Sequence, residues 1–171
     1  MVAAAATGGD VVLENIIPPH LQPLTAKLRE ANVDVIEGED SIRVFVTRPL
    51  RSIDIKTMPY PGFPTDLQSQ VMAMLSTIPG ISIIIENIFE NRFMVAEELK
   101  RMGANIKVEG RMAVVEGVPA LQGTQVKATD LRAGAALVVA GLMAHGVTEI
   151  SNAHYIDRGY YDLEKKLLSL G

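Results

Sequence analysis

Cysteine and tryptophan are both absent from the 171 residues, and aromatic residues make up only 5% of them. Without cysteine, the chain has no disulfide framework, no cysteine-based zinc site and no thiol nucleophile. Positive charge is also scarce, with 16 Lys and Arg against 20 Asp and Glu and a net charge of −4. This balance argues against a nucleic-acid partner bound through a basic face. The three histidines show no metal-ligand spacing, and no metal site is expected.

Long apolar runs are missing as well. The longest strongly apolar stretch, Ala133–Ala144, has 12 residues, whereas a membrane-spanning helix needs about 20. The start of the chain lacks the basic segment and the apolar length of a signal peptide. We therefore expect no membrane partner and a cytoplasmic location. With 48% hydrophobic residues, the chain is long enough to bury the core of one domain.

What the sequence does contain is an internal repeat. Gly8–Ile16, Pro79–Ile88 and His145–Ala153 each combine a glycine turn, a short β-branched run and an asparagine. The asparagines are 72 and then 65 positions apart. In the first two copies an amphipathic helix follows, at Leu24–Ala31 and Val95–Met102. A period of this length indicates a solenoid or a closed domain of similar units.

One unit is predicted to run strand–helix–strand–strand–strand–helix. The copies are placed at residues 8–78 and 79–145, with an incomplete third copy at 146–171 whose helix is expected at Tyr160–Leu170. Leu131–Ala144 is apolar nearly all round, and a helix of this kind is usually buried. Strand segments such as Arg43–Val46 alternate, which suits sheets with one solvated face.

These patterns together predict the fold class. It is an α/β (α+β) domain built inside out, with pseudo-threefold repeats, buried helices and outer mixed sheets. Val2–Ala6 resembles the last turns of a helix, by analogy with Leu67–Ile78, and the third copy stops before its closing strands. We expect the chain to be a piece of a longer protein that is incomplete at both ends.

The strand-to-helix junctions are the first place to look for a site, because ligand sites favour such loops. The second copy has Arg92 after Phe89-Glu90-Asn91, and the third has Arg158 after Ile156-Asp157. The first copy has Ile17–Leu21 there, with no acid–arginine pair. Since packing demands should be alike in all copies, an arginine kept in two of them points to a ligand. The alternative is a solvated arginine, or a surface ion pair worth about 0–1 kcal/mol.

A Thr-Asp-Leu triplet precedes two of the expected helices, with Asp66 in one copy and Asp130 in the other. The simplest interpretation is that Thr or Asp is the N-cap of each helix. Asp66 differs because Pro59–Pro64, which contains three prolines, comes directly before its triplet. Prolines at fixed φ would hold a carboxylate in place. Both a capping and a ligand-binding role stay open at this point.

Four motifs resemble the signatures of the UDP-N-acetylglucosamine 1-carboxyvinyltransferase family of enolpyruvyl transferases, and they occur in the family's order. They are Phe63–Gln68, Ile88–Met94, Ala128–Gly134 and Ile156–Tyr160. The resemblance covers essentially the whole chain. It implies two similar domains of three repeats each, facing one another across a cleft. It also implies transfer of the enolpyruvyl group of phosphoenolpyruvate to the 3-hydroxyl of UDP-N-acetylglucosamine, the first committed step of peptidoglycan synthesis, without a metal or redox cofactor.

The same resemblance assigns roles to individual residues. Asp66 matches the aspartate that contacts the sugar hydroxyl and is the candidate base, and Ile88 and Phe89 match the uridine-sugar side. The groups around the phosphoenolpyruvate-derived moiety would be Arg92, Asp130 and Arg158, with Arg132 in support. The expected catalytic residues are Asp66, Asp130 and Arg158, and the expected substrate-binding residues are Asp66, Ile88, Phe89, Arg92, Arg132 and Arg158.

The family's other domain, which supplies a lid loop and further ligands, has no counterpart in this sequence. The expected partners are therefore the two substrates and that second domain. Two alternatives stay open: an inactive piece or binding module of the same fold, and a sibling enolpyruvyl transferase with another acceptor. The acceptor-side stretch Phe63–Gln68 argues against the sibling transferase.

Overall fold

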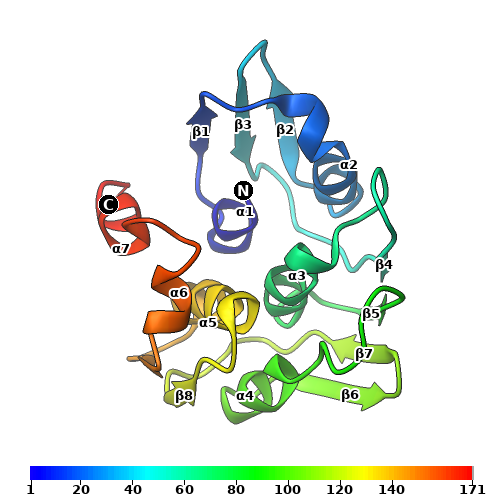
Figure 1. The fold of residues 1–171 in the computed structure, drawn as a ribbon, viewed down its shortest axis with the longest axis vertical. Coiled ribbons are helices and arrows are strands. Elements are labelled where there is room, and N and C mark those ends of the chain that lie inside the picture. Colours follow the sequence, from blue (N-terminus) through cyan, green and yellow to red (C-terminus); the bar gives the residue numbers. More distant parts are fainter. Residues whose placement is uncertain (171) are drawn as a thin grey trace.

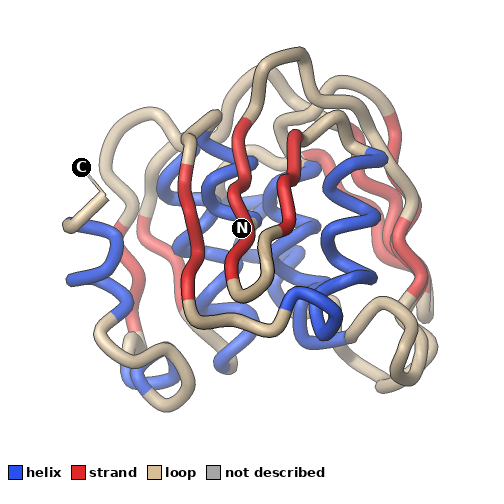
Figure 2. The backbone as a smooth tube through the Cα atoms, turned by 90° about the horizontal axis from the view of Figure 1, so that it is seen from above, coloured by secondary structure: helices blue, strands red, loops and turns tan. Residues whose placement is uncertain are grey.

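The computed structural model describes residues 1–170, and the glycine at the end of the third copy lies outside them. Three helices occupy the centre and the strands lie around them (Figures 1 and 2). The central helices are α1 (Val2–Thr7), α3 (Gln68–Leu75) and α5 (Leu131–Met143). They pack directly on one another. This arrangement confirms the fold class with its buried helices and outer sheets.

The element order repeats. The first unit contains β1 (Val11–Glu14), α2 (Gln22–Glu30), β2 (Asp34–Glu37), β3 (Ser41–Phe45), β4 (Ile55–Lys56) and α3. The second contains β5 (Ile81–Ile85), α4 (Val95–Arg101), β6 (Asn105–Glu109), β7 (Met112–Glu116), β8 (Gln125–Lys127) and α5. The third begins with β9 (Glu149–Ser151), α6 (His154–Asp157) and α7 (Leu163–Leu168). The order matches the expected unit, while the residue boundaries assigned to the copies stay a prediction.

Parallel strand pairs join one unit to the next. In the four-stranded sheet the order is β4-β5-β7-β6, with β4 and β5 parallel and the other pairs antiparallel. β8 pairs with β9 in the same parallel sense, and β1-β3-β2 form an antiparallel sheet. The last strand of one unit is thus hydrogen-bonded to the first strand of the next. We call these two parallel strand pairs, β4–β5 and β8–β9, seams. The first strand of each seam leads into a central helix, so the two Thr-Asp-Leu triplets lie at equivalent points.

Burial follows the alternation that the sequence shows. In β3 the side chains of Ile42 and Val44 are fully buried, and Arg43 between them is exposed. α3 is buried at every position, including its polar first turn. The interior is therefore helical and largely apolar, while the outer faces of the sheets carry both polar side chains and exposed apolar ones such as Val12 and Ile81.

Two expectations about helices are corrected. Leu131–Ala144 is not buried on every side, because Leu142 near its end is 45% exposed. The helix of the third copy begins at Leu163 rather than at Tyr160. Its start is delayed by Asp162, whose φ of 48° lies in the left-handed region and interrupts the helical path. In the described part of the chain, no helix is both long and apolar enough to cross a membrane.

Candidate functional site

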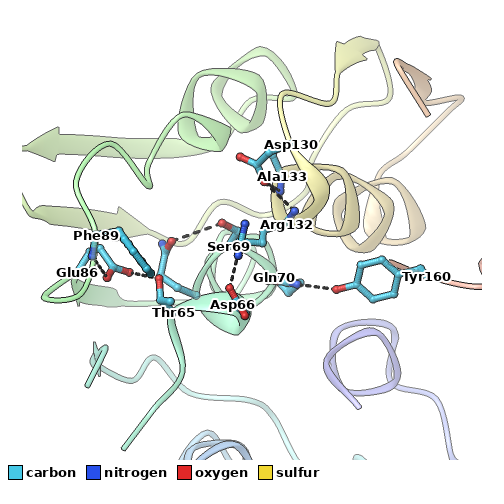
Figure 3. Close-up of polar contacts among 11 residues, drawn as sticks. Thr65, Asp66, Ser69, Gln70, Glu86, Phe89, Asp130, Arg132, Ala133 and Tyr160 are labelled. Carbon is cyan, nitrogen blue, oxygen red and sulfur yellow. Dashed lines mark hydrogen bonds and ion pairs between the residues drawn. The ribbon is translucent and has the colours of Figure 1, made fainter. Parts of the chain in front are cut away.

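The site candidates gather where α3 and α5 begin, beside the loop that follows β5 (Figure 3). Asp66 belongs to a short 3₁₀ turn, Thr65–Leu67, that leads into α3. Arg132 is in the first turn of α5, and its Nε donates a hydrogen bond to Oδ1 of Asp66. The Asp66 side chain stays 64% exposed in this ion pair and that of Arg132 31%. A carboxylate of the first unit and a guanidinium of the second therefore meet at the surface.

Asp66 does not cap its helix, which corrects one of the two sequence interpretations. The residue in the N-cap position of α3 is Leu67, and no side chain in the described chain caps the first turn of this helix. The 3₁₀ turn places Asp66 before the helix proper, with its carboxylate directed to Arg132 (Figure 3). The fold therefore does not use this carboxylate as a helix cap.

Asp130 does cap its helix, as predicted. Its backbone is extended, and its Oδ1 accepts hydrogen bonds from the backbone N–H of Arg132 at 2.7 Å and of Ala133 at 3.0 Å. Its other carboxylate oxygen, Oδ2, accepts no hydrogen bond from any residue in the range 1–170. Asp130 thus orders the turn that carries Arg132 and keeps one oxygen available to a ligand.

Ile88, Phe89 and Arg92 lie on the loop between β5 and α4. Phe89 is 49% exposed, and the guanidinium carbon of Arg92 lies 4.4 Å from the centre of its ring. This distance is that of a cation–π contact. The loop thus presents an aromatic face and a cation, and its Phe89 lies near the turn that carries Asp66 (Figure 3).

Glu86 is a residue of this site that the sequence reasoning missed. It follows β5 and is 1% exposed. Its carboxylate accepts hydrogen bonds from the hydroxyls of Thr57 and Thr65 and from the backbone N–H of Ile88 and Phe89. The signal was the alternation in β5, because Ser82 and Ile84 face inward and Glu86 has the same parity.

Arg158 stands apart from this cluster. It follows α6 and is exposed, and its side chain makes no hydrogen bond or ion pair with the rest of the described chain. The structure does not bring it into contact with Asp66. Its neighbour Tyr160 does reach the central helices, because Nε2 of Gln70 on α3 donates to its hydroxyl oxygen at 3.0 Å.

Close packing also fixes where α6 lies. A Cβ atom at Gly134 of α5 would come within 2.5 Å of the Ile156 side chain. A larger residue at this position would push α6, and Arg158 after it, away from α5. The third unit is therefore anchored to the two helices that carry the rest of the site.

Unpaired polar atoms mark the same helix ends. Among residues 1–170, Nε2 of Gln68, Oε1 of Gln70 and Oγ1 of Thr129 are buried without a hydrogen-bond partner. Such atoms cost free energy unless a water or a ligand group satisfies them. Gln68 and Gln70 lie in the first turn of α3, and Thr129 directly precedes Asp130. The fourth such atom in the described range, Oγ1 of Thr148, lies before β9, so three of the four atoms are at the beginnings of α3 and α5.

Known proteins resemble this chain over nearly its whole length. The family model of EPSP synthase (3-phosphoshikimate 1-carboxyvinyltransferase) matches residues 1–167. A UDP-N-acetylglucosamine 1-carboxyvinyltransferase of Desulfofundulus thermocisternus is 74% identical over the whole chain, which spans 70% of that relative. UDP-N-acetylglucosamine 1-carboxyvinyltransferase 2 of Carboxydothermus hydrogenoformans is 59% identical, and the chain spans 41% of its length.

Among solved structures, the enolpyruvyl transferase NikO from Streptomyces tendae superimposes with a TM-score of 0.87 at 30% identity. The match covers 99% of this chain and 42% of that one. The chain thus has the fold of one part of a larger transferase.

Proposed function

Because the chain belongs to the EPSP synthase (3-phosphoshikimate 1-carboxyvinyltransferase) family, we propose that it acts as part of a UDP-N-acetylglucosamine 1-carboxyvinyltransferase. The reaction would move the enolpyruvyl group of phosphoenolpyruvate to the 3-hydroxyl of UDP-N-acetylglucosamine. The names of the relatives that are 59% and 74% identical support this acceptor. Both substrates are charged metabolites, which supports a cytoplasmic location as part of the proposal.

The observation that carries the proposal is the state of Asp66. Its carboxylate is exposed, caps no helix and is oriented by Arg132 from the neighbouring unit. A carboxylate in this position can accept the proton of the sugar 3-hydroxyl as its oxygen bonds to C2 of phosphoenolpyruvate. C3 gains a proton in that addition, which an acid on the facing domain would deliver and could take back. In the elimination that follows, C3 loses a proton, the bond from C2 to the phosphate oxygen breaks, and inorganic phosphate leaves.

The positive groups suit the anionic partner of this reaction. Guanidinium groups bind carboxylate and phosphate through two parallel N–H bonds. The Arg158 side chain is exposed and unpaired within the described chain, and the Arg92 guanidinium lies over the Phe89 ring. We assign both to the phosphoenolpyruvate-derived moiety, together with the free oxygen of Asp130. Arg132 would support the same site while orienting Asp66.

Ile88 and Phe89 are assigned to the uridine-sugar side. Phe89 offers an exposed aromatic face, and its backbone N–H is anchored to Glu86. The opposite wall of the cleft would come from the domain that relatives such as the Carboxydothermus protein have beyond the matched 41%. No residue assigned to this reaction requires a bound metal or redox cofactor.

The test is phosphate release from phosphoenolpyruvate in the presence of UDP-N-acetylglucosamine. It compares this chain alone with a full-length enzyme that carries this chain as its matching segment, for example in place of that of the Carboxydothermus relative. We expect steady release by the full-length enzyme and none above background by the chain alone, because catalysis needs groups on both sides of the substrate. Release that is unchanged when UDP-N-acetylglucosamine is omitted would contradict the proposed acceptor.

A further inference from the structure

We propose that Glu86 is a positioning residue, whose buried carboxylate holds the turn of Asp66 against the Ile88–Phe89 loop. The inference rests on the proposed function, since it concerns the geometry of the candidate base and of the acceptor-side loop. Figure 3 shows the arrangement, with Glu86 between Thr65 on one side and Phe89 on the other.

The two carboxylate oxygens of Glu86 hold different segments. Oε1 accepts from the Ile88 N–H at 2.8 Å and the Phe89 N–H at 3.1 Å, and from Oγ1 of Thr57 at 2.8 Å. Oε2 accepts from Oγ1 of Thr65 at 2.8 Å. One oxygen therefore fixes the loop, and the other fixes the residue directly before Asp66. A shift of either segment would break a bond to the same rigid group.

Burying this carboxylate would be costly without those four donors. In the described part of the chain it has no cationic partner, since no ion pair includes Glu86. Its donors are two hydroxyls and two backbone amides, and hydrogen bonds to an ionised acceptor are shorter and stronger than neutral ones. Such a fully satisfied network favours one geometry over its alternatives. The network thus supplies orientation that an apolar residue at this position would not.

The repeats argue that the fold itself does not require this carboxylate. Glu14 and Ser151 occupy the matching positions of the other units, and both are exposed. At the equivalent seam, Ser151 donates to the Val126 carbonyl, and Oγ1 of Thr129 has no partner among residues 1–170. The β8–β9 seam therefore closes without any bond like that between Thr65 and Glu86. Within residues 1–170, a buried carboxylate of this kind is found only at the seam that leads to Asp66.

The decisive variant is Thr65→Val, which keeps the shape of the side chain and removes the hydroxyl that binds Oε2. Thr129→Val is the matched control, because it removes the equivalent hydroxyl where no bond is lost. In the full-length enzyme, we expect Thr65→Val to lower kcat about 10- to 100-fold, as small misplacements of reacting groups do. The KM for phosphoenolpyruvate should change less than kcat, and Thr129→Val should keep kcat within about twofold of the parent. Equal kcat values in the two variants would overturn the proposal.

A second pair of variants separates positioning from chemistry. In Glu86→Gln, the amide oxygen can still accept hydrogen bonds from the backbone N–H groups of the Ile88–Phe89 loop, and the amide NH₂ can donate to the Thr65 hydroxyl. Glu86→Gln should therefore retain most of kcat and the pH profile, whereas Glu86→Leu should lose both the bonds and the activity. Loss of activity in Glu86→Gln as complete as in Glu86→Leu would show that the charge itself takes part, and it would contradict a positioning role.

A third measurement does not depend on activity. In this chain, the amide protons of Ile88 and Phe89 should exchange with solvent faster in Glu86→Leu than in Glu86→Gln, because only the glutamine offers an acceptor. If the parent enzyme releases no phosphate, the proposed function fails, while this exchange pattern still reports on the network. Unchanged protection in Glu86→Leu would show that the carboxylate does not hold the loop.

Discussion

The two Thr-Asp-Leu triplets have the same residues and lie at equivalent seams, yet their aspartates make different contacts. Asp130 caps α5 through two backbone amides. Asp66 caps nothing and pairs across the surface with Arg132. A short motif therefore does not determine the contacts of its aspartate, because these contacts depend on the backbone conformation around it.

The backbone difference has a visible cause. Asp130 has an extended backbone, so its side chain folds back over the first turn of α5. Asp66 sits within a 3₁₀ turn that follows Pro64, whose backbone is extended, and the helix begins only after Leu67. Thr65 is drawn to the buried Glu86, while Thr129 has no partner in the described chain. The aspartate after the first seam is therefore exposed, whereas the aspartate after the second seam is used to cap a helix.

Among the variants that test this comparison, we expect Asp66→Asn to have the largest effect on turnover. In the full-length enzyme, kcat should fall about 10²–10⁴-fold, since that is the usual contribution of a general base. The melting temperature should stay close to that of the parent, because no helix amide loses a partner. Steady-state kinetics beside a melting curve give the measurement. Near-normal turnover in a folded variant would remove Asp66 from the mechanism.

Arg132 connects the two seams, and its loss should have the next largest effect. In Arg132→Gln, the charged partner of Asp66 is gone, while the backbone N–H that Asp130 caps remains. Hydrogen bonds to charged groups contribute about 1.5–3 kcal/mol, which corresponds to roughly a 10- to 150-fold loss of kcat/KM. Lys127→Gln, at the end of β8, serves as a control for the loss of one positive charge close to the start of α5. Equal activity in Arg132→Gln and Lys127→Gln would show that the ion pair is incidental.

A variant of Arg158 tests whether an arginine that recurs in two of the units binds a ligand. Arg158→Lys keeps the charge but loses the planar fork that binds a carboxylate through two N–H groups. Phosphoenolpyruvate should bind the full-length variant more weakly, by about 1.5 kcal/mol if one charge-assisted bond is lost. Its melting temperature should hardly change, because the side chain is exposed and unpaired within residues 1–170. A lower melting temperature with unchanged affinity would make Arg158 part of the scaffold.

Much of the fold could be predicted because it is repeated and periodic. The order of elements and the central position of buried helices follow from patterns within the chain. The helix after Tyr160 was misplaced, because the left-handed backbone of Asp162 depends on local geometry that periodicity does not encode.

The site was predicted less completely, for physical reasons. Asp66 and Asp130 share one local sequence, so the sequence around them could not tell a cap from a free carboxylate. Glu86 was missed because a charged residue at the end of a strand usually faces solvent. Its burial depends on two threonines, 21 and 29 positions earlier, that converge only in the folded chain. Arg132 was found only through the family motif, because its partner lies in another unit.

The most direct test of the difference between the seams is the free energy of unfolding of this chain in urea, for Asp66→Ala beside Asp130→Ala. Removing an N-cap aspartate typically costs about 0.5–2 kcal/mol. We expect a loss in this range for Asp130→Ala. For Asp66→Ala the loss should be at most about 0.5 kcal/mol, since an exposed ion pair contributes little. Equal losses in the two variants would mean that both aspartates serve the fold, and would contradict the account of Asp66 as a carboxylate kept free for chemistry.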